Sequence, residues 1–188
     1  MTILAFDKFK TASLVEQTEI FDLLFEHTDA LIKHTLKDAS GKFNLSEIQN
    51  YSDLIEKVRN TLLYIAQTSS CDKEQKDDLS NIIEAHPKLG VPKETQGELS
   101  VFSKSEQKNM SSSDSSDENK QILIDLNNQY EDKYEGLRFV CFVNGRNQAQ
   151  IIHEIKDIIN SGNTWSEECI RSINAMCDIA LDRLRKVL

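Results

Sequence analysis

His86 is the residue of this chain whose type and position best suit acid–base chemistry. It follows Leu79, Ile82 and Ile83 at the spacing i, i+3, i+4, i+7, so on a helix it shares their apolar face. Pro87 ends that helix, because a proline pushes the preceding residue out of the α region. The negative end of the helix dipole favours a protonated ring and partial burial a neutral one. We therefore expect His86 to titrate near neutrality, as a general acid or base should.

Ser103, Glu106 and Gln107 form a second polar group close together in the chain. A hydroxyl, a carboxylate and an amide at this spacing are able to hold a polar heterocycle. A helix-capping box has the same S-x-x-E form and needs no ligand to explain it. His86 likewise fits a core histidine that is hydrogen-bonded to a carbonyl. These residues alone leave both interpretations open.

Other sites for chemistry find little support in the sequence. His27, His34 and His153 lie in polar-flanked helical positions, and we expect them at the surface. No H-x-x-x-H or H-E-x-x-H motif indicates a metal site. The segment Asn144-Gly145-Arg146 has a single glycine, so it is no phosphate-binding loop, and no G-x-S-x-G nucleophile elbow is present.

The cysteines indicate a reducing compartment. Cys71, Cys141, Cys169 and Cys177 include no C-x-x-C pair, which argues against a disulfide framework or a zinc site. The N-terminus carries charge too early for a signal peptide, and no apolar run reaches the roughly 18–20 residues that span a bilayer. The C-terminal Lys186-Val187-Leu188 only loosely resembles a peroxisomal address. We expect a soluble protein that is not secreted and that is cytoplasmic or peroxisomal.

The composition is that of an ordinary globular domain. The chain has 188 residues, of which 39% are hydrophobic and 28% charged, so we expect one domain over residues 1–188. Its net charge of −9 argues against a nucleic-acid partner, since phosphate binding needs clustered Lys and Arg. Only 6 glycines and 2 prolines are present, which favours helices over a turn-rich β architecture.

Hydrophobic periodicity predicts an all-α domain of about seven helices with one short extended segment. Capping boxes at Ser13-Leu14-Val15-Glu16 and Thr164-Trp165-Ser166-Glu167 mark two helix starts. The first helix carries Phe21, Leu24, Phe25 and Ile32 on one face up to the break at residues 39–42. Further helices are predicted around residues 54–66, 79–86, 122–134 and 151–159, and a short one from Ser103.

Two segments between these helices have distinct compositions. The apolar run 139–143 is too short for a buried helix and is predicted to be extended, with Asn144-Gly145 as the turn that closes it. The serine-rich, acidic residues 111–117 lack apolar side chains. We expect a mobile surface loop near residues 110–119 and no domain boundary.

The order of the motifs resembles the 2-oxo-4-hydroxy-4-carboxy-5-ureidoimidazoline (OHCU) decarboxylase family over nearly the whole chain. Each motif alone is weak, whereas the H-P-x-L-G and S-x-x-E-Q pair at this spacing is fairly specific. The motifs that carry the resemblance are Leu24-Phe25-Glu26-His27, Ala85-His86-Pro87-Lys88-Leu89-Gly90, Ser103-x-x-Glu106-Gln107, Tyr130-x-x-Lys133-Tyr134 and Phe139-Val140-Cys141-Phe142-Val143-Asn144-Gly145-Arg146.

The resemblance implies a small-molecule enzyme of purine breakdown. Its expected fold is all-α, its expected assembly a homodimer, and it needs no metal or organic cofactor. The reaction removes CO₂ from the ureidoimidazoline formed downstream of urate and gives (S)-allantoin. We expect neither a nucleic acid nor a membrane as a partner.

The resemblance also implies roles for individual residues. His86 is the expected acid–base residue, and Pro87 shapes the pocket beside it. Arg183, seven residues after Met176 on the same helix face, is expected to reach the substrate carboxylate, with Arg146 as its rival. The remaining expected substrate contacts come from the side chains of Ser103, Glu106 and Gln107 and from the backbone of Phe139, Val140, Cys141, Phe142 and Val143.

The chain departs from the family pattern near the expected site. Before the extended segment the family commonly has F-G-F-P-F, whereas this chain has Tyr134-Glu135-Gly136-Leu137-Arg138-Phe139, which is one residue longer and lacks the proline. The A-G-L that often follows E-Q is replaced by Lys108-Asn109-Met110. Two alternatives stay open: an inactive helical relative that binds partners through the acidic serine loop, and a lyase for a related ureide.

Overall fold

The structure is a computed structural model that describes residues 3–68, 72–91, 102 and 117–188. Within these ranges the chain forms eight α-helices, one short 3₁₀ helix and no strand. The predicted all-α class is therefore confirmed. Ser103, Glu106, Gln107 and residues 110–116 of the expected acidic loop lie outside the described ranges.

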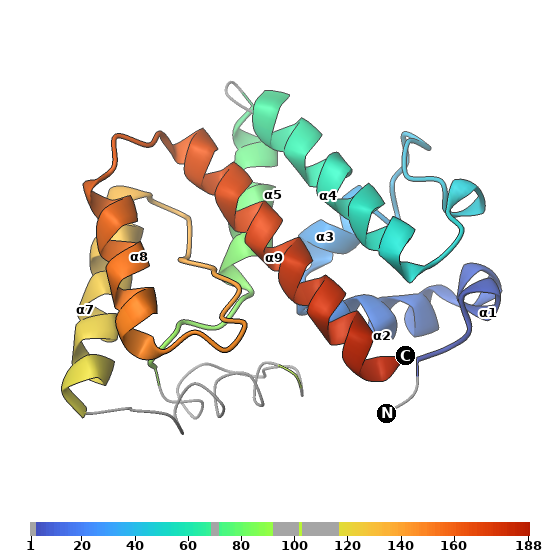
Figure 1. Cartoon of the computed structure of the whole chain (residues 1–188). Helices are drawn as coiled ribbons and strands as arrows, with labels where there is room; N and C mark the ends of the chain where they lie inside the picture. Colours follow the sequence, from blue (N-terminus) through green and yellow to red (C-terminus); the bar gives the residue numbers. More distant parts are fainter. Residues whose placement is uncertain (1–2, 69–71, 92–101, 103–116) are drawn as a thin grey trace.

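The helices surround a long C-terminal helix (Figure 1). The α9 helix packs along α4 and also contacts α2 and α5. The α7 and α8 helices pair with each other at one end of the molecule, α1 lies at the other end, and α3 packs against α5 between them. The helix bounds are α1 Phe6–Thr11, α2 Leu14–Phe25, α3 Asp29–His34, η1 Leu45–Glu47, α4 Tyr51–Thr68, α5 Lys73–Glu84, α7 Asp117–Lys133, α8 Gln148–Asn160 and α9 Trp165–Val187.

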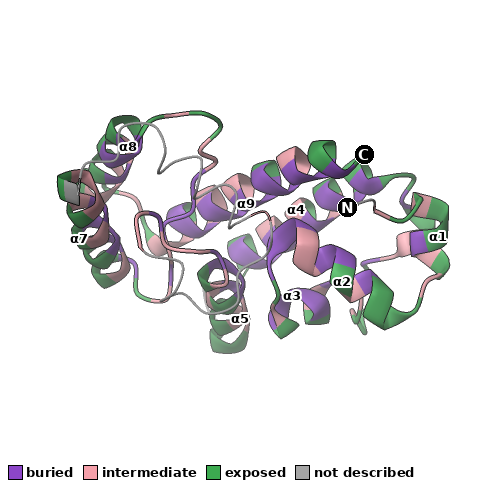
Figure 2. Ribbon diagram, turned by 90° about the horizontal axis from the view of Figure 1, so that it is seen from below, coloured by how far each residue is buried: buried purple, intermediate pink, exposed green. Residues whose placement is uncertain are grey.

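The core follows the predicted helix faces. Buried residues lie along α4 and α9 (Figure 2), and these two helices pack against each other. The predicted faces of α4 and α5 are buried, including Leu54, Val58, Leu79 and Ile82. No helix within the described ranges is long and apolar enough to cross a membrane.

Capping side chains fix where the helices begin. Both predicted capping boxes are present, from Ser13 to Glu16 at α2 and from Thr164 to Glu167 at α9. Each cap hydroxyl accepts the N–H of the glutamate, whose carboxylate in turn accepts the N–H of the cap residue, and this satisfies donors that the helix leaves unpaired.

The N-terminal third differs from the prediction in two places. The expected first helix is split, because α2 ends at Phe25 and Glu26 adopts φ 91°. Thr28 then caps α3, and its side chain accepts the N–H of Ala30. The six-residue α1 helix was not predicted, because it buries only Phe9 and so has no apolar period.

Residues 137–143, before α8, form neither helix nor strand, so the prediction that residues 139–143 are not helical is confirmed. Asn144 (φ 41°) and Gly145 (φ 74°) form the predicted turn, which the Arg146 N–H closes on the Val143 carbonyl at 2.8 Å. The end of the expected acidic loop needs correction, since residues 117–119 already belong to α7.

Candidate active site

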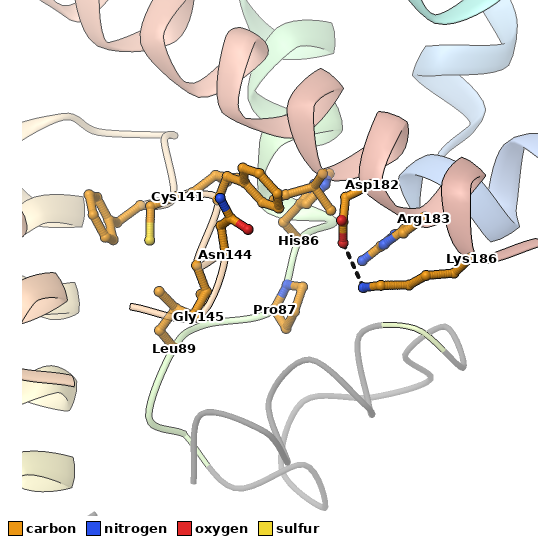
Figure 3. Close-up of a pocket in the computed structure, with 14 residues that line it drawn as sticks. His86, Pro87, Leu89, Cys141, Asn144, Gly145, Asp182, Arg183 and Lys186 are labelled. Carbon is orange, nitrogen blue, oxygen red and sulfur yellow. Dashed lines mark ion pairs between the residues drawn. The ribbon is translucent and has the colours of Figure 1, made fainter. Parts of the chain in front are cut away.

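A cavity of about 290 Å³ lies where α5, the extended segment and α9 meet (Figure 3). The end of α5 supplies His86, with Pro87 and Leu89 after it. Residues 139–145 form a second wall. The last turns of α9 supply Ile179, Asp182, Arg183 and Lys186. The cavity thus joins residues from three distant parts of the chain.

His86 is placed at this cavity by the end of α5. Its N–H bonds the Ile83 carbonyl at 3.2 Å, and Pro87 prevents the helix from continuing. The side chain is buried, at 3% exposure. Neither ring nitrogen has a hydrogen-bond partner among the residues that the structure describes. A structural core histidine normally has such a partner, so the geometry favours the functional interpretation.

The His86 ring does not titrate near neutrality, contrary to our expectation from the sequence. Its pKa is lowered to about 4, chiefly by burial and next by the positive charge of Arg183. The carboxylate of Glu26 and the nearby Ile82 carbonyl act in the opposite direction, and Arg138 again lowers the pKa. Burial therefore outweighs the helix dipole, because a charged ring loses its hydration. His86 is neutral at physiological pH in the unliganded protein.

The loop after His86 is fixed against α7. Gly90 adopts φ 80°, and a Cβ there would lie 2.8 Å from the Cβ of Leu123, so only glycine fits. The Asn127 side chain donates to the Leu89 carbonyl at 2.9 Å. These contacts explain the physical need for the glycine in H-P-x-L-G.

Arg183 lines the cavity and is almost fully buried. Its Nη1 lies 2.9 Å from the Glu26 carboxylate and donates to the Leu24 carbonyl at 3.1 Å. The left-handed backbone at Glu26 ends α2 and brings that carboxylate to α9. The buried charge of Arg183 is thereby compensated, as a buried ion requires.

Arg146, the rival for the substrate carboxylate, does not line this cavity. It pairs with Glu154 and donates to the carbonyls of Phe142 and Val143. Its guanidinium therefore holds the second wall of the cavity in place. Of the two arginines, the structure brings Arg183 to His86.

The extended wall offers donors and few acceptors. Its carbonyls at Val140, Phe142 and Val143 accept hydrogen bonds from arginine side chains. The N–H groups of residues 139–143 donate to no residue in the described part of the chain. Burial raises the pKa of the Cys141 thiol in this wall to about 12, so its sulfur stays protonated and is a poor nucleophile.

A buried polar network that the sequence did not reveal supports the same wall. Arg171 donates to the Val140 carbonyl at 2.8 Å, and its guanidinium lies 5.0 Å from the centre of the Phe139 ring. Glu168, with no exposed surface, accepts from Arg171 at 2.7 Å and from the Tyr130 hydroxyl at 3.0 Å. An E-x-x-R pair on an otherwise apolar helix face is the sequence signal that indicates such a network.

Comparison with known proteins identifies the family of this chain. The family model for OHCU decarboxylase matches residues 10–185. The chain belongs to the OHCU decarboxylase family. A uric acid degradation bifunctional protein from Bacillus sp. (strain TB-90) is 28% identical over 132 residues, which cover 70% of this chain and 24% of that protein.

A solved structure shares the fold of this family member. The crystal structure of (S)-allantoin synthase aligns with a TM-score of 0.62 and 16% identity, over 98% of this chain and 54% of the other. The chain thus spans about a quarter of the curated relative and about half of the solved structure. At this identity the structural likeness shows the fold alone.

The cavity of this OHCU decarboxylase family member contains two charged residues that the sequence analysis missed. Asp182 and Lys186 lie one helical turn apart on α9 and pair at 2.6 Å, marked by the dashed line in Figure 3. Asp182 precedes Arg183 by one residue and Lys186 follows it by three. This spacing around Arg183 is the sequence signal that could have indicated both residues. The three side chains make the α9 wall strongly polar.

Two expectations concern metals and the minor histidines. The described residues contain no group of three or more His, Cys, Asp or Glu side chains arranged to hold a metal ion. His27 and His153 are exposed as expected, whereas His34 is half-buried and bonds Asp78 at 2.8 Å.

Proposed function

We propose that this protein decarboxylates 2-oxo-4-hydroxy-4-carboxy-5-ureidoimidazoline to (S)-allantoin and CO₂. The observation that carries the proposal is a neutral, buried imidazole, without a described hydrogen-bond partner, that shares a cavity with Arg183. Family membership supports the same reaction. A cavity of about 290 Å³ is near the lower end of small-molecule sites, which suits a compact heterocycle.

Arg183 and His86 divide the work in this proposal. Arg183 attracts the substrate carboxylate and sets the orientation of the bond to be broken. When the C–C bond breaks, CO₂ leaves and the bonding electron pair passes through the ring to the imine nitrogen, which takes up a proton from solvent. His86, neutral at the start, accepts the proton of the ring hydroxyl as that oxygen becomes a carbonyl. The protonated imidazole of His86 then delivers a proton to one face of the substrate carbon that bears the ureido group.

The extended wall is suited to the negative charge that develops on the substrate. The N–H groups of residues 139–143 have no acceptor in the described part of the chain. The carbonyls of Val140 and Val143 already accept hydrogen bonds from arginine side chains. Donors that are fixed before the reaction stabilise developing charge without reorganisation. We assign the oxygen and nitrogen atoms of the substrate ring to these amides, and the ureido group to Ser103, Glu106 and Gln107.

The proposal is tested with freshly generated substrate. Urate is oxidised and hydrolysed enzymatically in the cuvette, and the decay of the ureidoimidazoline is followed by absorbance and circular dichroism. We expect faster decay with protein and a pure (S)-allantoin signal. Decay at the spontaneous rate, with racemic product, would contradict the proposal. Faster decay to another product would favour a lyase for a related ureide.

The remaining expectations about assembly stay predictions. The homodimer is tested by light scattering of the purified chain over a range of concentrations. A mass of one chain throughout would contradict it.

A further inference from the structure

Arg138 links the end of α5 to the extended wall of the cavity. Its Nη1 donates to the His86 carbonyl at 2.6 Å and also to the Glu84 carbonyl. Arg138 directly precedes the wall that starts at Phe139. One side chain therefore holds the backbone of His86 and the start of the opposite wall at a fixed separation.

Arg138 binds carbonyls at and just after the end of α5: Glu84 is the last residue of the helix, and His86 follows its cap residue Ala85. The last carbonyls of an α-helix have no partner within the helix and carry the negative end of its dipole. Pro87 follows His86 and has no N–H, so it donates no hydrogen bond to a carbonyl of α5. A guanidinium at this position satisfies two carbonyls with one planar donor group and places a positive charge at the negative helix end.

Arg138 belongs to a chain of ion pairs, the charged ladder, in which Glu131 contacts both Arg138 and Lys88. Its Nε lies 3.6 Å from one oxygen of Glu131 on α7, and the other oxygen of Glu131 binds Lys88 Nζ at 2.5 Å. Lys88 lies in the loop after His86. The ladder thus connects α7, the H-P loop and Arg138, and it limits how far the guanidinium can move away from the helix end.

We propose that Arg138 is a positioning residue for His86: by bridging the carbonyls of Glu84 and His86, it holds the imidazole in place at the cavity. This inference rests on the proposed role of His86. It gives a reason for the arginine at position 138, directly before the cavity wall. It also assigns Arg138 a role in the site although Arg138 is not among the residues that line the cavity.

The electrostatic surroundings of His86 agree with this role. Arg183 from α9 and Arg138 from the wall both favour the neutral ring, and Glu26 after α2 favours the protonated one. Asp182 and Lys186 on α9 also line the cavity but pair with each other. Cys141 is the remaining titratable group of the wall, and its thiol is uncharged.

The first experiment measures the His86 ring directly by NMR titration of the unliganded protein from about pH 3.5 to pH 8, a range that includes its pKa of about 4. His86→Asn identifies its signals. We expect Arg138→Gln to raise the pKa of His86 by about half a unit to one unit, because a nearby charge and a helix end act together. At pH 5.5 the protonated fraction then rises roughly three- to tenfold. An unchanged titration in folded Arg138→Gln overturns the proposal.

Two further variants separate position from charge. Arg138→Lys keeps the charge but not the planar fork, so we expect a nearly normal His86 titration and a lower kcat at similar KM. Arg59→Gln is the control, because Arg59 also bridges two helices, to Asn174 and Asp178 on α9, and does not line the cavity. It should leave the His86 titration unchanged. A His86 shift as large in Arg59→Gln as in Arg138→Gln also overturns the proposal.

The titration needs no substrate, so its result is independent of the proposed reaction. If the wild type fails to turn over the ureidoimidazoline while Arg138→Gln shifts the His86 titration, the proposed function fails and the role of Arg138 stands. If turnover is normal and the titration is unaffected by Arg138→Gln, the reverse holds.

Discussion

Arg183 and Glu26 form a buried ion pair of 2.9 Å between α9 and the residue that ends α2, beside the cavity that holds His86. The guanidinium is 1% exposed and the carboxylate 5%. The pair closes the bundle across a large sequence separation and also sets the charge that faces the His86 ring. Packing and chemistry therefore depend on the same contact.

The first prediction concerns the strength of this pair. Glu26→Gln removes a carboxylate that compensates the buried guanidinium of Arg183. Removing one partner of a buried ion pair is strongly destabilising, so we expect the free energy of unfolding to fall by about 3 kcal/mol. Urea unfolding followed by circular dichroism measures this.

Asp178→Asn is the matched control for Glu26→Gln. It breaks the pair of Arg59 with Asp178, whose side chain is 51% exposed, and exposed pairs contribute only about 0–1 kcal/mol. Equal losses in the two variants would show that burial adds nothing to the Glu26–Arg183 pair.

The second prediction concerns the pH dependence of stability. Burial lowers the pKa of His86 to about 4, whereas an unfolded histidine has a pKa of about 6.5. Between these values the unfolded chain binds a proton that the folded chain does not, so His86 lowers stability as the pH falls. Between pH 7 and pH 5 this amounts to about 2 kcal/mol.

The variant that tests this dependence is His86→Asn, in which the loss of stability between pH 7 and pH 5 should be smaller than in the wild type by that amount. His153→Asn removes an exposed histidine and should keep the wild-type dependence. Parallel curves for wild type and His86→Asn would show that the folded protein already protonates His86 in this range.

Much of the fold follows from local patterns in the sequence. The capping boxes at Ser13 and Thr164 predicted two helix starts correctly, because capping depends on residues only three positions apart. The break at Glu26 escaped prediction, because its left-handed backbone is stabilised by contacts that include the distant Arg183. Apolar periodicity continued across it from Phe25 to Ile32 and concealed the turn.

In the site too, features that depend on local sequence were predicted, and features that depend on distant contacts were not. The H-P pattern placed His86 at a helix end facing inward, and the structure agrees. Its pKa was not predictable, because the extent of burial and the charges of Arg183 and Glu26 arise only in the folded chain. Arg138 stood out in the sequence only as a departure from the family pattern. Its contact with the carbonyls of Glu84 and His86 depends on how the wall folds back on α5.

The third prediction is that activity needs no metal ion. Within the described ranges no group of metal-ligating side chains is present, and the proposed chemistry uses only a base, a cation and backbone donors. Turnover should be unchanged after exhaustive chelation and gel filtration. A loss of activity that added divalent metal restores would contradict the mechanism.

The fourth prediction concerns Glu106, which lies outside the described residues. If Glu106 only caps a helix, Glu106→Ala should cost about 0.5–2 kcal/mol of stability and leave kcat/KM nearly unchanged. We expect the opposite, with a similar thermal midpoint and a large loss of kcat/KM, because the carboxylate is proposed to hold the ureido group. Thermal unfolding and turnover of one preparation distinguish these outcomes, and Glu16→Ala, in the established capping box of α2, provides the reference for a pure cap.

The last prediction is that His86 carries the proton transfer. His86→Asn and His86→Gln keep a polar side chain in the cavity but remove the titrating ring. General acid–base catalysis contributes about 10²–10⁴-fold, so kcat should fall by that factor while the circular dichroism spectrum stays that of the wild type. Because the neutral ring is the active form and burial holds its pKa near 4, wild-type kcat/KM should stay level at neutral pH and fall only as the pH approaches 4–5. That acid limb should be absent from the residual activity of both variants. A folded His86→Asn protein with near-normal turnover, or one that retains the limb, would assign the proton transfer to another residue.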